Sequence, residues 1–149
     1  MLKILDVGSG IGNEGMIKAF FGDVEKEVIR LDINPEVNPD ILHDITQPLP
    51  EEHIGKYDIV FSSHMLEHME RAQVFPVMRN IASAVKNLGE VWIIVPDLKW
   101  AAQEILAGRD GMQVQGLLYG AQRPGNPWDI HKSGFTLNAL RRAEQLHGP

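Results

Sequence analysis

Short apolar runs alternate along this chain with segments whose apolar residues recur at helical spacing. The runs are rich in β-branched residues and predict strands at residues 2–7, 27–31, 39–42, 57–61 and 91–95. The first and the last run are apolar almost throughout, as in strands covered on both faces, so we expect both in the sheet interior. This alternation predicts an α/β fold with a doubly wound, mostly parallel sheet.

Helical spacing marks the segments between these runs. The clearest helix covers residues 70–88, and its apolar stripe consists of Phe75, Met78, Ile81, Val85 and Leu88. Gly89 follows where a C′ glycine belongs, and we expect Pro76 in the first turn, where its missing N–H is tolerated. Further helices are predicted at residues 13–21, closed by Gly22, at 97–107, and at 136–146, capped by Thr136.

Composition and charge narrow the class of protein. The 149 residues carry 14 lysines and arginines against 20 acidic residues, and this balance disfavours a broad nucleic-acid surface. The absence of cysteine excludes disulfides, thiol nucleophiles, zinc–cysteine sites and iron–sulfur clusters. No apolar run approaches the roughly 20 residues that span a bilayer, and Asp6 comes too early for a signal-peptide core. We therefore expect a single cytoplasmic domain over residues 1–149, with neither a membrane nor a nucleic acid as partner.

The most informative stretch is a glycine-rich turn between the first strand and the first helix. Gly8, Gly10 and Gly12 allow a positive φ and a close approach of the backbone to a ligand. A dinucleotide fingerprint would have its third glycine at the position of Asn13, and a phosphate loop would need Gly-Lys-Ser/Thr. Asp6 would repel a pyrophosphate and attract an ammonium or a sulfonium group. The turn therefore favours a cationic ligand, and a tight strand–helix turn with an incidental acid is the alternative.

A second acid stands at the end of the second predicted strand. Asp32 follows the first glycine by about two dozen residues, where a carboxylate can accept hydrogen bonds from both hydroxyls of a ribose. Asp32-Ile33-Asn34-Pro35 is also a good turn starter, which is the alternative interpretation. Placed after Asp6 and the glycines, Asp32 and its neighbour Ile33 are candidate contacts of an adenosine ligand.

Together these residues resemble the class I S-adenosylmethionine-dependent methyltransferases, and more narrowly their small type 11 members. The resemblance also rests on the Asp44-Ile45 pair and on residues 57–68, and it covers about residues 2–95. A weaker similarity continues through residues 129–135 and the last helix. The resemblance implies S-adenosylmethionine as cofactor and a Rossmann-like sheet in a minimal five-strand form, without the family's usual last two strands.

Carried over to this sequence, the family's cofactor contacts lie where the strands end. The methionine part of the cofactor would be surrounded by Asp6, Gly8, Gly10 and Gly12. Asp32 would hold the ribose, and Asp44 would bind the adenine amino group, with the backbone of Ile45 beside it. Ser62 and Ser63 would line the cofactor near the sulfonium. Ligands of open parallel sheets bind where the strand order reverses, which in this family lies between the first and fourth strands.

Histidines are the candidate catalytic bases, because an unperturbed pKa near 6.5 lets them accept a proton at neutral pH. His64 and His68 are four residues apart and would share one face of a helical turn. Glu67 would fall off that face and no third ligand is recognisable, so we predict no metal site. We expect one of the two imidazoles to line the pocket and the other to cap or pack, and His64 is the first candidate base. His131 is the second candidate base, with a surface histidine as the alternative.

Residues 108–133 contain many glycines and two prolines, which disfavour a regular helix or strand over this range. A loop of this length inside a compact domain is usually functional or disordered. It carries Tyr119, Arg123, Trp128 and Lys132, a mixture that suits a flat, sugar-like or anionic acceptor. We therefore expect an irregular acceptor or lid loop at 108–133.

The sequence thus predicts a methyltransferase that acts on a small-molecule acceptor. The alternatives are a non-catalytic adenosyl-ligand-binding or interaction module and a nicotinamide-dependent oxidoreductase, which Asp6 and Asn13 disfavour. In the five-strand form, the run at 91–95 would lie at the sheet edge, where a long apolar edge tends to pair with another chain. We expect this edge to be covered by the loop and the last helix or to be buried in a homodimer.

Overall fold

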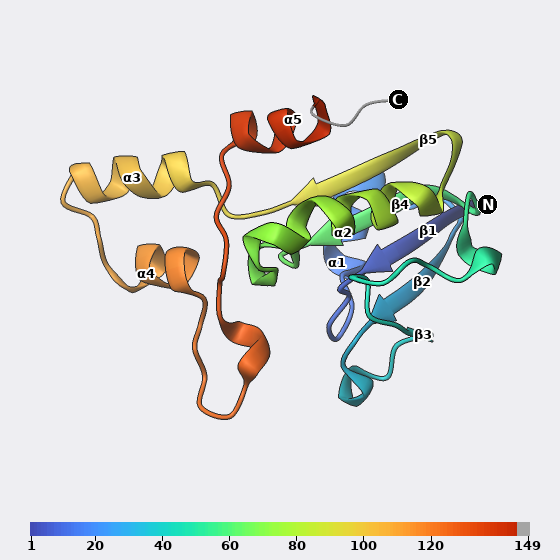
Figure 1. The fold of residues 1–149 in the computed structure, drawn as a ribbon, viewed down its shortest axis with the longest axis horizontal. Coiled ribbons are helices and arrows are strands. Elements are labelled where there is room, and N and C mark those ends of the chain that lie inside the picture. The colour runs from blue at the N-terminus through green and yellow to red at the C-terminus, as the bar shows by residue number, and fades with distance from the viewer. Residues whose placement is uncertain (146–149) are drawn as a thin grey trace. The chain divides into compact units, whose positions relative to one another are not determined.

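The computed structural model describes residues 1–145 (Figure 1), which contain a five-stranded parallel sheet. The strands are β1 (Leu2–Val7), β2 (Lys26–Asp32), β3 (Ile41–Leu42), β4 (Tyr57–Ser63) and β5 (Val85–Ile94). Their spatial order is β3-β2-β1-β4-β5, and every neighbouring pair is parallel. The order reverses between β1 and β4, where the resemblance places the cofactor site. The predicted five-strand α/β fold is confirmed.

The chain divides into two compact units. The first, called here the sheet unit, consists of Met1–Met65 and Pro76–Ile94 and contains all five strands. The second, called the helical unit, consists of Leu66–Phe75 and the described residues from Val95 onward. The division falls inside helix α2 (Arg71–Ala84).

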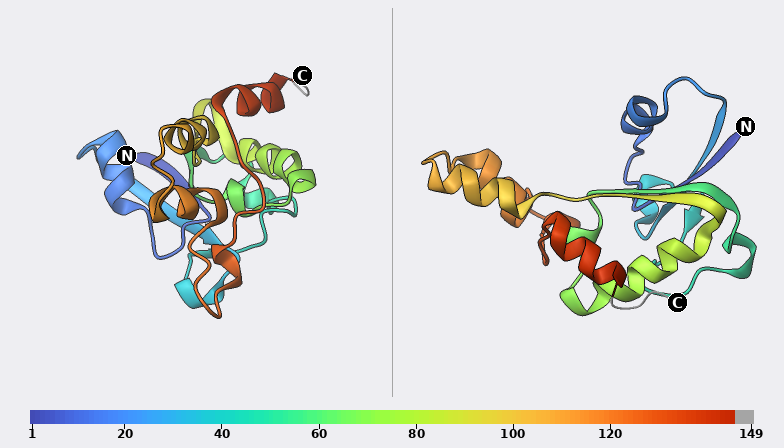
Figure 2. Two further views of the ribbon diagram at one scale, coloured as in Figure 1. Left: turned by 90° about the vertical axis from the view of Figure 1, so that its left-hand side faces the viewer. Right: turned by 90° about the horizontal axis from the view of Figure 1, so that it is seen from above.

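Two helices cover the sheet unit. Helix α1 (Glu14–Phe21) ends at Gly22, whose φ of 65° suits glycine, as predicted. It lies on one face of the sheet, and the later turns of α2 lie on the other (Figures 1 and 2). On the α1 face, the buried cluster consists of Ile4, Ile17, Ile59 and Phe61. Strands covered by helices on both sides are the doubly wound arrangement that the alternating pattern predicted.

The predicted helix at 70–88 is wrong at its end. Helix α2 stops at Ala84, and Val85 already pairs with Tyr57 as part of β5. Gly89 is therefore not a helix cap: a Cβ on it would lie 2.7 Å from the carbonyl oxygen of Asp58, where the β4–β5 register shifts. The apolar residues at helical spacing continued into a strand, because sheet pairing overrode the local pattern.

Two further predictions about this region need correction. Pro76 lies inside α2, beyond the first turn that begins at Arg71. Strand β5 lies at the sheet edge and not in the interior, and its Val91 is 37% exposed. The apolar run alone could not distinguish an edge strand from a central one. The edge position agrees with the five-strand form.

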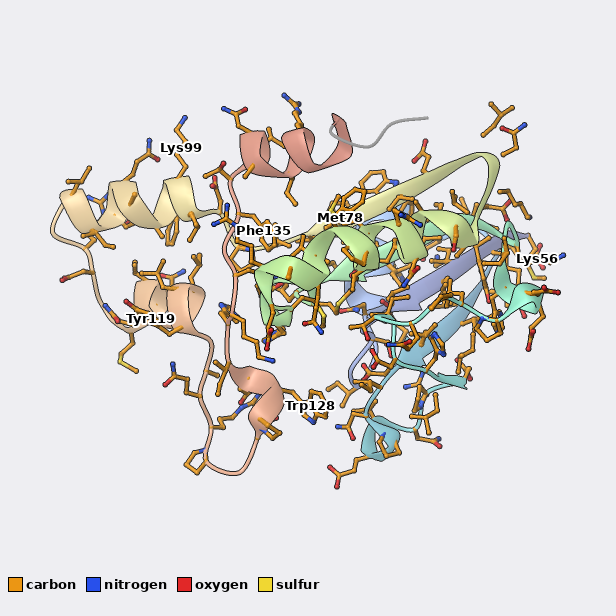
Figure 3. All side chains as sticks on the ribbon, in the orientation of Figure 1. Lys56, Met78, Lys99, Tyr119, Trp128 and Phe135 are labelled. Atoms are coloured by element: carbon orange, nitrogen blue, oxygen red, sulfur yellow. The ribbon has the colours of Figure 1, made fainter. Side chains whose placement is uncertain are left out.

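Besides the first residues of α2, the helical unit contains three complete α-helices among the described residues. Helix α3 (Leu98–Leu106) is capped by Asp97, which accepts a hydrogen bond from the Lys99 N–H at 2.9 Å. Helix α5 (Leu137–Gln145) begins with the predicted cap, since the Ala139 N–H donates to Thr136 Oγ1 at 3.2 Å. Leu146, where this helix was predicted to end, lies outside the described residues. Figure 3 labels Lys99 on α3 and also Phe135. Phe135 forms an isolated parallel β-bridge with Asp97, the cap of α3.

The prediction of an irregular loop at 108–133 is wrong in part. Helix α4 (Met112–Tyr119) lies within this range and accommodates Gly116 in its interior. A 3₁₀ turn over Pro127–Asp129 follows, and only the connections around these elements are irregular. Glycine interrupts helices only on average, and a helix tolerates Gly116 at a cost of about 1 kcal/mol relative to alanine. No helix in the described part of the chain is both long and apolar enough to cross a bilayer.

Candidate functional site

The glycine turn after β1 has the backbone geometry that its sequence predicted. Gly8, Gly10 and Gly12 have φ values of 67°, 54° and 108°. A Cβ on Gly8 would lie 2.3 Å from Met65 Cγ, so that position requires glycine. A Cβ on Gly10 would meet no atom within 4 Å. The turn is therefore packed at Gly8 and open above Gly10, where a ligand can approach the backbone.

Asp6 supports this turn from the end of β1. Its carboxylate is fully buried and accepts hydrogen bonds from the Asn13 N–H at 3.3 Å and from Asn13 Nδ2 at 2.9 Å. Burial raises the pKa of Asp6 from 3.8 to about 6, although the Asn13 donors act in the opposite direction. Asn13, which excluded a dinucleotide fingerprint, is thus the residue that orients the acid. Sequence reasoning missed this pairing.

Asp32 connects the end of β2 to the same turn. Its Oδ2 accepts from the Gly10 N–H at 2.8 Å, and its Oδ1 accepts from the Asn34 N–H at 2.9 Å. The side chain is 9% exposed, whereas the neighbouring Ile33 is 42% exposed. The turn-starter interpretation also holds, because Asn34 Oδ1 accepts from the Glu36 N–H at 3.0 Å. Asp32 therefore contacts the same glycine turn whose end Asp6 supports through Asn13.

Asp44 and Ile45 follow β3 and are fixed by local contacts. Asp44 Oδ1 accepts from the Thr46 N–H at 2.9 Å and from Thr46 Oγ1 at 2.8 Å. The Ile45 carbonyl accepts from Asn80 Nδ2 at 2.9 Å, so α2 holds this segment in place. Asn80 has no motif of its own, and its contribution to the site could not have been predicted.

The end of β4 supplies the two predicted serines. Ser62 is 1% exposed, and its hydroxyl has no hydrogen-bond partner among the described residues. Ser63 donates to Met16 Sδ at 3.2 Å. A buried hydroxyl without a partner is unfavourable, which is typical of a group that a ligand completes. Three features suit the adenosyl sulfonium cofactor that the resemblance implies: the Ser62 hydroxyl, the open space above Gly10, and the acids at the strand ends.

His64 and His68 do not share a helical face, which corrects the sequence prediction. His64 has a φ of 54°, and its N–H donates to the Ile94 carbonyl at 2.9 Å. A 3₁₀ turn over Leu66–His68 follows. His64 is exposed in the sheet unit, whereas His68 belongs to the helical unit.

His131 is a half-buried residue of the helical unit and not a plain surface histidine. Its N–H donates to the Tyr119 carbonyl at 3.2 Å, and its Nδ1 lies 2.9 Å from the Leu117 carbonyl oxygen. Its ring is 4.9 Å from the ring of His68, between centroids. The last turn of α4 therefore positions one of the two predicted catalytic bases.

The residues suspected of forming an acceptor pocket lie around the connection between α4 and the following 3₁₀ turn. Tyr119 and Trp128, labelled in Figure 3, are 54% and 50% exposed. Arg123 forms a two-pronged ion pair with Asp129, with distances of 2.5 and 2.8 Å, and this holds the pKa of Asp129 below its ordinary value. A shallow surface hollow nearby is lined by Gln122, Arg123, Gly125, Asn126, Pro127 and Ile130.

A parallel sheet with a glycine turn and acids at the carboxyl ends of its strands defines a Rossmann-like, doubly wound α/β fold. The family follows from comparison with known sequences: residues 2–147 match a family described as a methyltransferase domain. The chain therefore belongs to this family. The predicted relationship to the class I S-adenosylmethionine-dependent methyltransferases is confirmed.

Solved structures share the fold at low sequence identity. A SAM-dependent methyltransferase from Archaeoglobus fulgidus has a TM-score of 0.62 and 18% identity, over 97% of this chain and 59% of its own. The DhpI–SAM–HEP complex has a TM-score of 0.64 and 20% identity, over 97% and 69%. The complex of the Haloferax volcanii Trm112 methyltransferase activator with a methyltransferase has a TM-score of 0.61 and 15% identity, over 97% and 59%. No protein of curated function matches the sequence. This chain spans less than two thirds of the length of the Archaeoglobus protein.

Proposed function

We propose that this chain is a methyltransferase that uses S-adenosylmethionine to methylate a small molecule. The observation that carries the proposal is the junction at the carboxyl ends of β1 and β2. There Asp32 binds the Gly10 N–H, and the buried Asp6 carboxylate lies under the same turn. A carboxylate at this place suits a cation and disfavours a pyrophosphate. The proposal therefore favours a sulfonium cofactor over a nicotinamide dinucleotide.

The cofactor is S-adenosylmethionine, which supplies a methyl group on a positively charged sulfur. On the proposed assignment, Asp6 and the open backbone at Gly10 face its methionine part, and Asp32 holds its ribose. Asp32 already accepts two backbone N–H groups, so it would bind the ribose hydroxyls with its remaining lone pairs. Asp44 and the Ile45 backbone would meet the adenine, and Ser62 and Ser63 would line the sulfonium end.

His64 and His131 remain the candidate bases of the proposal. Methyl transfer requires the acceptor atom in line with the methyl carbon, so positioning supplies much of the acceleration before any base acts. A base matters for an acceptor that must lose a proton, such as a hydroxyl. Three predictions from the sequence belong to the proposal: a small-molecule acceptor, a cytoplasmic location, and a β5 edge that is either covered or buried in a homodimer.

Two measurements test the proposal. Calorimetric titration should detect one site for S-adenosylmethionine and for S-adenosylhomocysteine, and no site for NAD. Asp32→Ala should weaken the binding of both adenosyl ligands by about 100-fold, because it removes roughly two hydrogen bonds to a charged group. Asp40→Ala is the matched control, because Asp40 also accepts a backbone N–H, that of Arg30 at 2.8 Å, outside the proposed site.

Methyl consumption with a panel of hydroxyl, amine and carboxyl acceptors then separates an enzyme from a binding module. Turnover with one acceptor class supports the proposal. Cofactor binding without turnover across the panel would favour the non-catalytic module, and an affinity that Asp32→Ala changes less than twofold would contradict the ribose assignment.

A further inference from the structure

We propose that Glu67, His68 and His131 form a binding site for a zinc-type divalent cation in the helical unit. Each side chain offers one ligand atom, and these atoms all lie within 4.8 Å of one another. Glu67 is 1% exposed, and both imidazoles are half-buried. Two histidines and a glutamate are a ligand set that zinc uses in proteins, and imidazole nitrogen disfavours magnesium and calcium. The site uses none of the proposed contacts of the methyl donor, but it includes His131, so zinc bound there would leave His64 as the candidate base.

The hydrogen bonds of the two rings orient them for a metal. His68 Nδ1 lies 3.0 Å from the Ile130 carbonyl oxygen, and His131 Nδ1 lies 2.9 Å from that of Leu117. A carbonyl oxygen only accepts, so each Nδ1 carries the hydrogen and each neutral ring keeps a lone pair on Nε2. Metal-binding histidines usually donate their other ring N–H to a carbonyl or a carboxylate in this way. Both rings are therefore in the tautomer that binds a cation through Nε2.

The chain segments that carry the ligands are held together without a metal. The Glu67 carbonyl accepts from the Lys132 N–H at 2.7 Å and from the Ser133 N–H at 3.1 Å. The Ser133 hydroxyl lies 3.2 Å from the Leu66 carbonyl oxygen and 2.9 Å from that of Met69. These bonds join residues more than 60 positions apart in the sequence. The ligands are thus brought together in advance, which reduces the entropy lost on binding.

Gly120 fixes the place of His131 relative to α4. Its φ is 80°, and a Cβ there would lie 1.7 Å from the Asp129 carbonyl oxygen and 3.1 Å from His131 Cδ2. Only glycine allows this close approach, which lets the His131 backbone and ring bind the last carbonyls of the helix. The imidazole is therefore held by the fold and is not a freely rotating surface group.

Binding requires only rotation of the ligand side chains. Zinc bonds of about 2.0–2.2 Å in tetrahedral geometry place ligand atoms roughly 3.4 Å apart. One nitrogen of each ring and one carboxylate oxygen lie within 4.8 Å of one another, so rotation of the side chains can bring both Nε2 atoms and this oxygen to zinc-binding separation. Three protein ligands leave a fourth position for water or for another oxygen ligand.

The test is calorimetric titration of the chelator-treated protein with Zn²⁺ and, separately, with Mg²⁺. One zinc per chain is expected, with no measurable magnesium binding. Zinc affinity should fall by about 100-fold in each of three variants, His68→Ala, His131→Ala and Glu67→Gln. This is the upper end of the loss in metal affinity that follows removal of a group supporting a ligand. His43→Ala is the matched control, because His43 lies outside the cluster and also contacts a backbone carbonyl, that of Gln47. The His43→Ala variant should bind zinc as tightly as the wild type.

Two further readouts keep the result interpretable. Nitrogen NMR of the metal-free protein should show Nδ1–H tautomers for His68 and His131, and zinc should shift their Nε2 signals. Glu67→Gln retains the backbone carbonyl and the side-chain size, so it tests the carboxylate if an alanine variant loses its circular dichroism spectrum. Zinc affinity that is equal in the wild type and in Glu67→Gln, or that falls as much in His43→Ala, would overturn the site, as would no zinc binding.

Discussion

The sheet unit and the helical unit organise their polar residues in different ways. In the sheet unit, Asp6, Asp32 and Ser62 stand where parallel strands end, so the register of the sheet brings them to one edge. In the helical unit, Glu67 and His131 meet because backbone carbonyls of one segment receive the N–H groups of another. The first arrangement can be predicted from strand positions, whereas the second depends on contacts that leave no pattern in the sequence.

The largest predicted effect concerns the packed side of the glycine turn. Gly8→Ala should destabilise the protein by about 2–4 kcal/mol, because its Cβ would overlap Met65 and its φ is 67°. Gly10→Ala has a similar φ of 54° but open space, so it should cost only about 1–2 kcal/mol. Urea denaturation of both variants measures the difference. Equal losses of stability would show that the contact with Met65 does not constrain the turn.

Asp6 gives the next prediction, which concerns pH. Its pKa rises from 3.8 in the unfolded chain to about 6 in the fold, so ionisation destabilises the native state. The cost is absent below about pH 4 and reaches about 3 kcal/mol above pH 6, at 1.4 kcal/mol for each pKa unit. Asp6→Asn should therefore be more stable than the wild type at pH 7.5 by about 1–3 kcal/mol, with a smaller difference at pH 4.5.

The same substitution should weaken S-adenosylmethionine binding, because it removes the negative charge that faces the cation. Denaturation at the two pH values and calorimetry at pH 7.5 measure the two effects on one variant. A variant that is less stable than the wild type at both pH values would show that the Asn13 hydrogen bonds outweigh the burial of charge.

Much of the sheet unit was predictable from its sequence. The strand ends, the glycine turn and Gly22 follow from local residue types, and Asp32 joins Gly10 as the strand positions required. The error at Val85 arose because an apolar residue at helical spacing also fits a strand, and only pairing with Tyr57 decides between them.

The helical unit was less predictable, for a physical reason. Helix α4 was missed because Gly116 and its neighbouring glycines outweighed a weak helical pattern. The pairing of His68 with His131 was missed because it depends on the backbone carbonyls of Leu117 and Ile130, which carry no sequence signal. The adjacent residues Glu67 and His68 do not by themselves indicate a third ligand as distant in the sequence as His131.

A smaller effect is expected at the contact within the helical unit. Ser133→Ala removes the hydroxyl that binds the carbonyls of Leu66 and Met69, and should destabilise this unit by about 1–2 kcal/mol. Hydrogen exchange should quicken at Lys132 and Ser133 and remain unchanged in β1. Thr136→Ala is the matched control, since it removes a hydroxyl that binds within its own helix. Faster exchange throughout the sheet would contradict a local effect.

The smallest change concerns the exposed edge of the sheet. If β5 pairs with a second copy, light scattering should detect a dimer, and the amides at residues 91–95 should exchange slowly. The fold of each chain would be unchanged. A monomer with fast exchange throughout this stretch would contradict the prediction that the edge is either covered or buried in a homodimer.

The titration of Asp6 itself, followed by carbon NMR of its carboxyl group, tests the central claim most directly. The free protein should show a pKa of about 6 for this group. S-adenosylmethionine should lower that pKa, because a cation favours the ionised carboxyl, and it should lower it further than S-adenosylhomocysteine, whose sulfur is uncharged. A pKa that S-adenosylmethionine leaves unchanged or raises would contradict a carboxylate placed to receive the sulfonium cofactor.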